Sequence, residues 1–236
     1  MQRILFSIVL FFMVPGILIG QEMLGYVEVN GSVKDRLRPL NNANVEIYAN
    51  NTLLKVETTD ITGNFDFVLE LNRTYKIKFT REFYVTKMVR FDTHVRENEL
   101  GIWLFQFTVE LFPDIKQIDF SFLEKEPVGK ISYDMKYGEF EHDHEYTRKI
   151  HARIKKLLEN YNSARNEAYE RVVKRADSLL KQGESILAIN QYRRAAVLDR
   201  SNEYPTEQML KIDKELRETL DGYERYVSLL QNADSL

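Results

Sequence analysis

The sequence predicts an α+β protein with two domains, a seven-stranded antiparallel β-sandwich followed by an α-helical region. Between Tyr26 and Phe112, apolar and polar residues alternate in short runs separated by turn-forming residues, which is typical of strands. After Glu145 the apolar residues recur every three or four positions, which is typical of amphipathic helices. The 236 residues are enough for one or two domains with hydrophobic cores.

The first twenty residues, "MQRILFSIVLFFMVPGILIG", have the layout of a secretory signal peptide. Arg3 supplies the positive start, an apolar run follows from Ile4 to Ile19, and Gly20 is a small residue at the end. The run is shorter than the ~20 apolar residues that comfortably span a bilayer. We therefore expect residues 1–20 to be removed on export, which leaves a soluble protein; an uncleaved anchor is the alternative.

Residues 21–112 contain the predicted strands. The separators include Asn30-Gly31, Asn50-Asn51 and Thr62-Gly63-Asn64, which are turn formers. In the last run, Trp103, Phe105 and Phe107 share one face, and we expect that face to pack in the core. The seven runs are "YVEVNGSV", "ANVEIYAN", "LLKVETT", "GNFDFVLEL", "TYKIKFTR", "VTKMVRFDT" and "WLFQFTVELF". Their spacing predicts a sandwich of antiparallel strands.

One family pattern is matched in this half at Gly31, Val33, Pro39, Leu40, Ala43, Val45, Thr59, Asp60, Gly63, Phe65 and Tyr75. With these residues the half resembles the carboxypeptidase-regulatory-like, or transthyretin-like, β-sandwich family. The resemblance implies the fold of an exported module and no particular activity. We interpret Asp60 and Gly63 as a tight turn in preference to a calcium site, because Asp bonds back to the turn backbone and Gly accepts positive φ.

Residues 113–145 are predicted to form a connector. The stretches "IDFSF" and "VGKISYDM" are compatible with short extended pieces, and Pro127 interrupts them. The whole segment resembles the link that follows such a sandwich in envelope proteins of Bacteroidota, and the resemblance implies no activity for it.

Residues 146–232 are predicted to be helical. A long first helix ends at Gly183, either as one rod or with a break near Asn160–Asn162, a second helix reaches Asp199, and a third follows Pro205. The stretch from 176 to 205 resembles a tetratricopeptide repeat, with departures at Ser185 and Arg200. One repeat is fewer than the roughly three that stable arrays need, so we expect a hairpin completed by the leading helix or a partner.

The stretch "GEFEHDHEYTRKIH" holds three of the four histidines at the junction between the two parts. His142, His144 and Glu145 are minority candidates for metal ligands, but no His-Glu-x-x-His motif is present. The favoured interpretation is a polar junction in which Asp143 caps the following helix and neighbouring acidic residues complement its positive end.

No catalytic constellation stands out, and we predict no enzyme activity and no cofactor. The chain has no cysteine, which excludes disulfides and thiolate chemistry, and its net charge of −3 argues against nucleic-acid binding. We predict an adaptor of the periplasm or outer membrane that binds an envelope protein, with Tyr192, Arg193 and Tyr223 as candidate contacts. The alternative is a carbohydrate- or peptidoglycan-binding module that uses Trp103 or Tyr84. A metal-dependent activity at the histidines is the third hypothesis.

Overall fold

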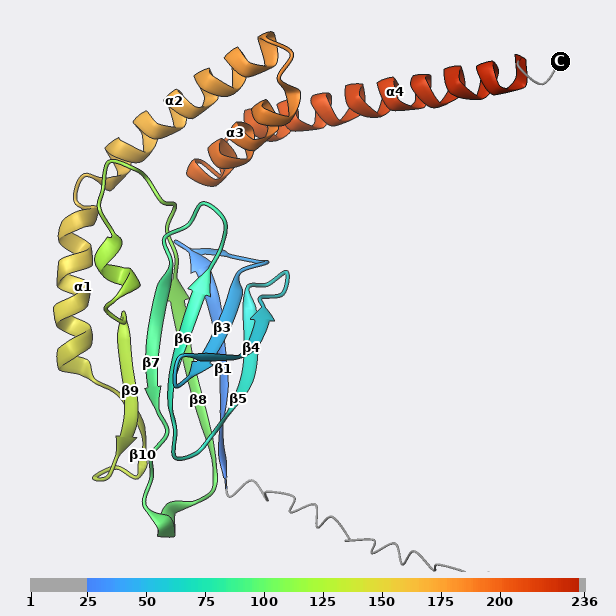
Figure 1. Ribbon diagram of the computed structural model, residues 1–236. Helices are drawn as coiled ribbons and strands as arrows, with labels where there is room; N and C mark the ends of the chain where they lie inside the picture. Colours follow the sequence, from blue (N-terminus) through green and yellow to red (C-terminus); the bar gives the residue numbers. More distant parts are fainter. Residues whose placement is uncertain (1–24, 234–236) are drawn as a thin grey trace, which may run out of the picture.

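The computed structural model describes residues 25–233, so the predicted signal peptide at 1–20 lies outside the described residues. Figure 1 shows two stacked β-sheets with helices along one side and across one end. In the smaller sheet, β1 (Tyr26–Asp35) pairs with β2 (Arg38–Pro39), β5 (Asn64–Glu70) and β8 (Ile102–Glu110). The larger sheet has the order β10 (Glu139–His142), β9 (Gly129–Asp134), β7 (Lys87–Asp92), β6 (Thr74–Thr80), β3 (Asn44–Ala49) and β4 (Thr52–Thr58).

The predicted sandwich is present, but its strands are neither seven nor all antiparallel. The described residues form ten strands, and β8 lies parallel to β1 while β9 lies parallel to β7. The chain leaves β7 in one sheet, crosses to β8 in the other, and then crosses back to β9. A connection that changes sheets does not impose the antiparallel direction that a tight hairpin does.

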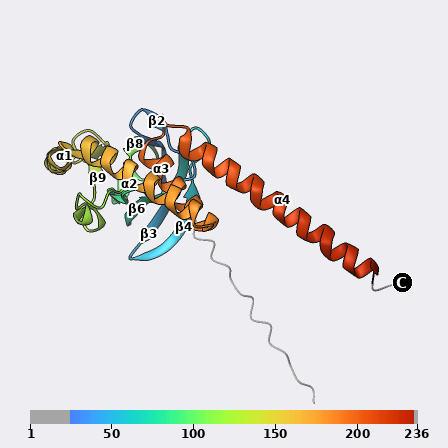
Figure 2. The same ribbon diagram turned by 90° about the horizontal axis from the view of Figure 1, so that it is seen from above.

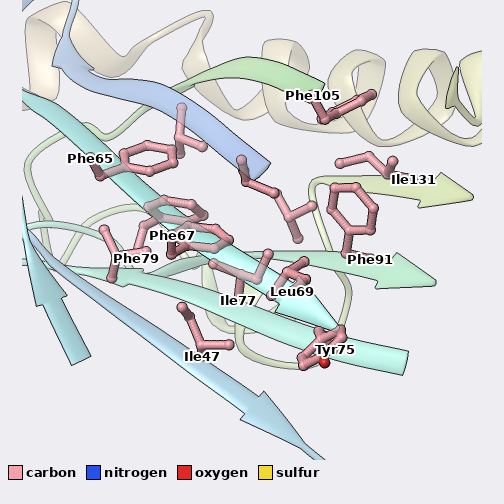
Figure 3. Packing of buried hydrophobic residues seen from close by; sticks show 14 of the residues in the cluster. Ile47, Phe65, Phe67, Leu69, Tyr75, Ile77, Phe79, Phe91, Phe105 and Ile131 are labelled. Carbon is pink, nitrogen blue, oxygen red and sulfur yellow. The ribbon is translucent and has the colours of Figure 1, made fainter. Parts of the chain in front are cut away.

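The main core lies between the two sheets (Figure 3). As predicted, the odd-numbered residues of β8 face inward: Phe105 and Val109 are buried, and Trp103 and Phe107 pack against the core. Phe79 meets Phe107 edge-on with ring centroids 6.0 Å apart. Gly31 lets β1 approach β8 closely, because a Cβ at this position would collide with the carbonyl oxygen of Phe107.

The predicted turn at Asp60 is confirmed. Its Oδ1 atom accepts hydrogen bonds from the backbone N–H groups of Thr62 (2.8 Å) and Asn64 (2.9 Å). Gly63 has φ of +78°, a conformation that a side chain would strain. These bonds hold the pKa of Asp60 below its usual value, with the Thr62 hydroxyl as the largest cause.

The segment predicted as a connector is largely part of the folded body. Strands β9 and β10 extend the larger sheet, so the sandwich does not end at residue 112. Between them and β8, Ile115, Phe120 and Leu123 are buried in a second core that includes Ile150 and Tyr161 of the helices. The pairing of β9 with β7 joins segments about 40 residues apart, which local periodicity does not reveal.

The long leading helix is broken. Of the two possibilities left open by the sequence, one rod or a break near Asn160–Asn162, the structure has the break. Helix α1 (His144–Leu158) and helix α2 (Tyr161–Lys181) are separate, with Glu159 and Asn160 between them. Gly183 follows α2 with φ of +80° and ends it, as predicted. Helix α3 (Ser185–Leu198) then packs back on α2, and helix α4 (Tyr204–Ala233) begins with Pro205 in its first turn.

The helical hairpin is attached to one end of the sandwich by polar contacts. Arg200 lies 3.7 Å from the buried carboxylate of Asp35, which also accepts a 2.9 Å hydrogen bond from the Tyr84 hydroxyl. Arg36 donates to the side-chain oxygen of Asn162 at 2.8 Å. Together with the second core, these contacts fix the hairpin, and with it α4, to the sandwich.

Candidate functional site

Helix α4 extends away from the rest of the protein (Figures 1 and 2). Its first turns are anchored, since Ile212 is buried in a third core and Met209 packs against it. From residue 213 to residue 224, every side chain is exposed. Leu216, Leu220 and Tyr223 are 39%, 57% and 64% exposed and share one face of the helix. We call these three residues the α4 stripe.

Of the three predicted partner contacts, only Tyr223 presents an open side chain. Tyr192 is 0% exposed and donates a 2.6 Å hydrogen bond to Asp177, so it holds α3 against α2 and is not available to a partner. Arg193 is exposed but forms an ion pair with Glu82 of the sandwich. A residue in a helical repeat can face either the groove or the core, and the spacing in the sequence does not distinguish the two.

The helix cap predicted at the histidine junction is present. Strand β10 ends at His142, and the Asp143 side chain caps α1 by accepting from the Tyr146 N–H at 2.9 Å. His144 pairs with Glu141 at 3.3 Å, and Glu145 pairs with Lys149 at 2.6 Å. Among residues 25–233, no three His, Asp or Glu side chains come together in a way that could hold a metal ion.

His142, His144 and His151 instead line one pocket with a volume of about 730 Å³. The pocket lies where β7, β8 and β10 meet α1, and it also includes Lys87 of β7. The His142 ring packs against Phe105 with centroids 5.2 Å apart. Burial lowers the pKa of His142, and the neighbouring His144 adds to this effect, so its ring favours the neutral form.

Lys87 is the residue of this pocket that the sequence analysis missed. Its side chain is 7% exposed, its ammonium group donates to the Glu110 carbonyl oxygen, and it lies 4.3 Å from the centroid of the Phe112 ring. Burial lowers the pKa of Lys87 to about 8. A signal was present, because the period-two alternation places Lys87 on the same strand face as Val89 and Phe91.

The two aromatic residues predicted to stack on sugar are inside the protein. Trp103 is partly buried and meets Tyr133 edge-on at 5.2 Å between ring centroids. Tyr84 is buried and bonded to Asp35. Neither ring offers a free face to a glycan.

In the part of the chain that the structure describes, none of the helices combines the length and the apolar character needed to cross a membrane. No family model matches the sequence, and no curated protein matches it.

Several solved structures have a slight likeness to the chain. A DUF3823 family protein from Parabacteroides merdae is 14% identical, with 47% of this chain and 53% of that one covered and a TM-score of 0.29. A Bacteroides uniformis protein assigned provisionally to carbohydrate binding is 14% identical, with 46% and 47% covered and a TM-score of 0.27. A 3-chlorocatechol 1,2-dioxygenase from Rhodococcus opacus is 12% identical, with 38% and 60% covered and a TM-score of 0.29. The chain thus matches less than two thirds of each, and TM-scores this low carry no argument about function.

Proposed function

We propose that the protein is a non-enzymatic adaptor of the bacterial cell envelope, exported to the periplasm or the inner face of the outer membrane. In this proposal the α4 stripe binds an apolar helical face of a second envelope protein. The resemblance of the first half to transthyretin-like modules and of the hairpin to a tetratricopeptide repeat supports the proposal. So does the full burial of Ala176, Ala188 and Ala195, the small residues expected where repeat helices meet.

The proposal rests mainly on one observation: much of α4 extends away from the rest of the protein. The helix has 30 residues, which corresponds to roughly 45 Å at ~1.5 Å per residue. Most helical stability in proteins comes from packing of an amphipathic face, whereas the α4 stripe is exposed and belongs to none of the hydrophobic cores of the described residues. A partner helix that covered the stripe would stabilise α4 and gain the free energy of burying three large side chains.

We expect the triple variant Leu216→Ala, Leu220→Ala, Tyr223→Ala to bind the partner at least about a hundredfold more weakly, since each buried apolar side chain contributes ~1.5 kcal/mol or more. Alanine keeps the helix propensity high. The matched control is Lys214→Ala, Glu218→Ala, Asp221→Ala on the opposite face. The measurement is crosslinking of tagged protein in envelope fractions, followed by titration of the identified partner.

The control variant should retain the partner that the stripe variant loses. If the stripe variant keeps the partner, α4 is not the binding element. If light scattering instead shows a dimer of this chain that only the stripe variant dissolves, the stripe is a self-association face and the adaptor proposal is wrong.

Glycan or peptidoglycan binding is the second candidate, now at a different place. A pocket of about 610 Å³ on the larger sheet is lined by Tyr48 and Tyr146 together with Asn51 and Arg90. Aromatic side chains beside amide and guanidinium groups suit sugar recognition. We expect glycan-array binding to fall at least tenfold in Tyr48→Ala and to persist in Tyr137→Ala, an exposed tyrosine outside this pocket. Binding that persists in both variants would rule this pocket out.

A further inference from the structure

We propose that the pocket between β8 and α1 binds a small ligand with an aliphatic body and a single carboxylate, and that Lys87 receives the carboxylate. This site goes beyond the adaptor function and does not depend on it. It lies on the sandwich side of the protein, in contact with α1 and not with α4. The inference rests on three kinds of observation: a buried cation, two buried polar atoms without partners, and apolar walls.

The buried cation is the ammonium group of Lys87. Its one hydrogen bond among the described residues is to the backbone carbonyl of Glu110, and no carboxylate of these residues lies within 4.0 Å of it. A buried charge is normally paired with an opposite charge, because desolvation without compensation costs free energy. Glu110 also lines the pocket and is exposed; its carboxylate raises the pKa of Lys87 but lies beyond 4.0 Å from the ammonium group, so it does not pair with it directly. Lys87 therefore retains donor capacity toward a ligand inside the pocket.

Two further polar atoms in the pocket wall lack partners. The Nδ1 atom of His142 and the hydroxyl oxygen of Thr147 are buried and form no hydrogen bond among the described residues. Both residues line the pocket with Lys87. A neutral imidazole can donate through one ring nitrogen, and a hydroxyl can always donate. Thr147 also lies in the first turn of α1, where the helix dipole favours negative charge.

Together, these groups fit a ligand that accepts hydrogen bonds and carries one negative charge. A carboxylate accepts several hydrogen bonds at once and forms strong charge-assisted bonds with an ammonium group. One buried cation balances one negative charge. A neutral alcohol would leave Lys87 without a directly bonded counter-charge.

The remaining walls define the body of the ligand. Aliphatic side chains of β7, β8, α1 and the segment before β9 contribute much of this wall, beside Phe107 and Phe112, while the charged residues Lys155 and Glu110 are exposed. A pocket of about 730 Å³ is within the usual range for small-molecule sites, which are mainly apolar with a few placed polar groups. The aliphatic residues are Val89, Val109, Val128, Ile154 and Leu158.

The test compares octanoate with 1-octanol by isothermal titration calorimetry on the purified full chain. These probes have the same aliphatic body and differ in the head group. We expect octanoate to bind the natural protein at least tenfold more tightly than 1-octanol. In Lys87→Met, which keeps the length of the side chain, this preference should disappear while 1-octanol binding stays within about twofold. The control Lys136→Met, at an exposed lysine outside the pocket, should behave as the natural protein.

A second variant separates recognition from folding. Thr147→Val removes the unpaired hydroxyl with little change in shape, and we expect it to weaken octanoate severalfold and leave 1-octanol unchanged. Equal affinity of the natural protein for the two probes, or full octanoate affinity in Lys87→Met, would overturn the proposal. The measurement needs no protein partner, so its failure would leave the adaptor proposal standing, and the reverse is also true.

Discussion

Replacing Lys87 with methionine is expected to raise the free energy of unfolding by about 2 kcal/mol at pH 7. Burial lowers the pKa of Lys87 from 10.5 to about 8, and each unit corresponds to about 1.4 kcal/mol of cost to the charged form. That cost is about 3.5 kcal/mol, from which about 1.5 kcal/mol is subtracted for the lost charge-assisted hydrogen bond to Glu110. Methionine fills a similar volume without a charge, as in other replacements of buried ions by apolar side chains.

The same argument predicts how the effect depends on pH. Below about pH 8 the lysine is charged in both the folded and the unfolded state, so the folded protein bears the full cost of burial. Between about pH 8 and the unfolded pKa of 10.5, the unfolded chain binds more protons, so the natural protein gains stability as pH rises. The advantage of Lys87→Met should therefore be constant below pH 8 and shrink above it.

The measurement is denaturant unfolding of both proteins from pH 6 to pH 10.5, with Lys136→Met as the control. Loss of the nearby charge should also raise the pKa of His151, which burial and then Lys87 hold below its usual value, and NMR titration can follow this change. A variant less stable than the natural protein at pH 7, or a difference unaffected by pH, would contradict the burial of a charged Lys87.

Replacing Tyr192 with alanine is expected to lower the free energy of unfolding by about 3–5 kcal/mol, the usual cost of truncating a fully buried aromatic side chain. Tyr192 is 0% exposed, lies in the core shared by α2, α3 and α4, and bonds Asp177 through its hydroxyl. The Tyr204 hydroxyl of α4 bonds the same carboxylate at 2.9 Å. Truncation should therefore loosen the attachment of α4 as well as the hairpin.

Helical circular dichroism during thermal and denaturant unfolding measures this effect. Tyr192→Phe, which removes only the hydroxyl, should cost about 1 kcal/mol. Arg193→Ala on the exposed side should cost under about 1 kcal/mol, since it removes a surface ion pair. Equal stability of Tyr192→Ala and Arg193→Ala would mean that Tyr192 does not hold the helices together.

The local elements follow from the sequence because their causes lie within a few residues. Period-two alternation identifies the strands between Tyr26 and Phe112, and three-to-four spacing identifies the helices after Glu145. The turn at Asp60, the helix cap at Asp143 and the helix end at Gly183 each depend on contacts within five positions. These features can be predicted from the sequence because hydrogen bonding at turns and caps is local.

Tertiary structure alone decided which strands pair and which side chains meet. The parallel placement of β8 beside β1, and of β9 beside β7, depends on connections that cross between sheets, which no short pattern encodes. Lys87 and His142 are about 55 positions apart, and they line one pocket only because β10 extends the sheet that contains β7 and α1 packs beside it. Likewise, three-to-four spacing describes Tyr192 and Tyr223 equally well. Whether such a side chain is buried or exposed depends on which helix lies against it. That in turn depends on how all the helices and strands of the chain pack together.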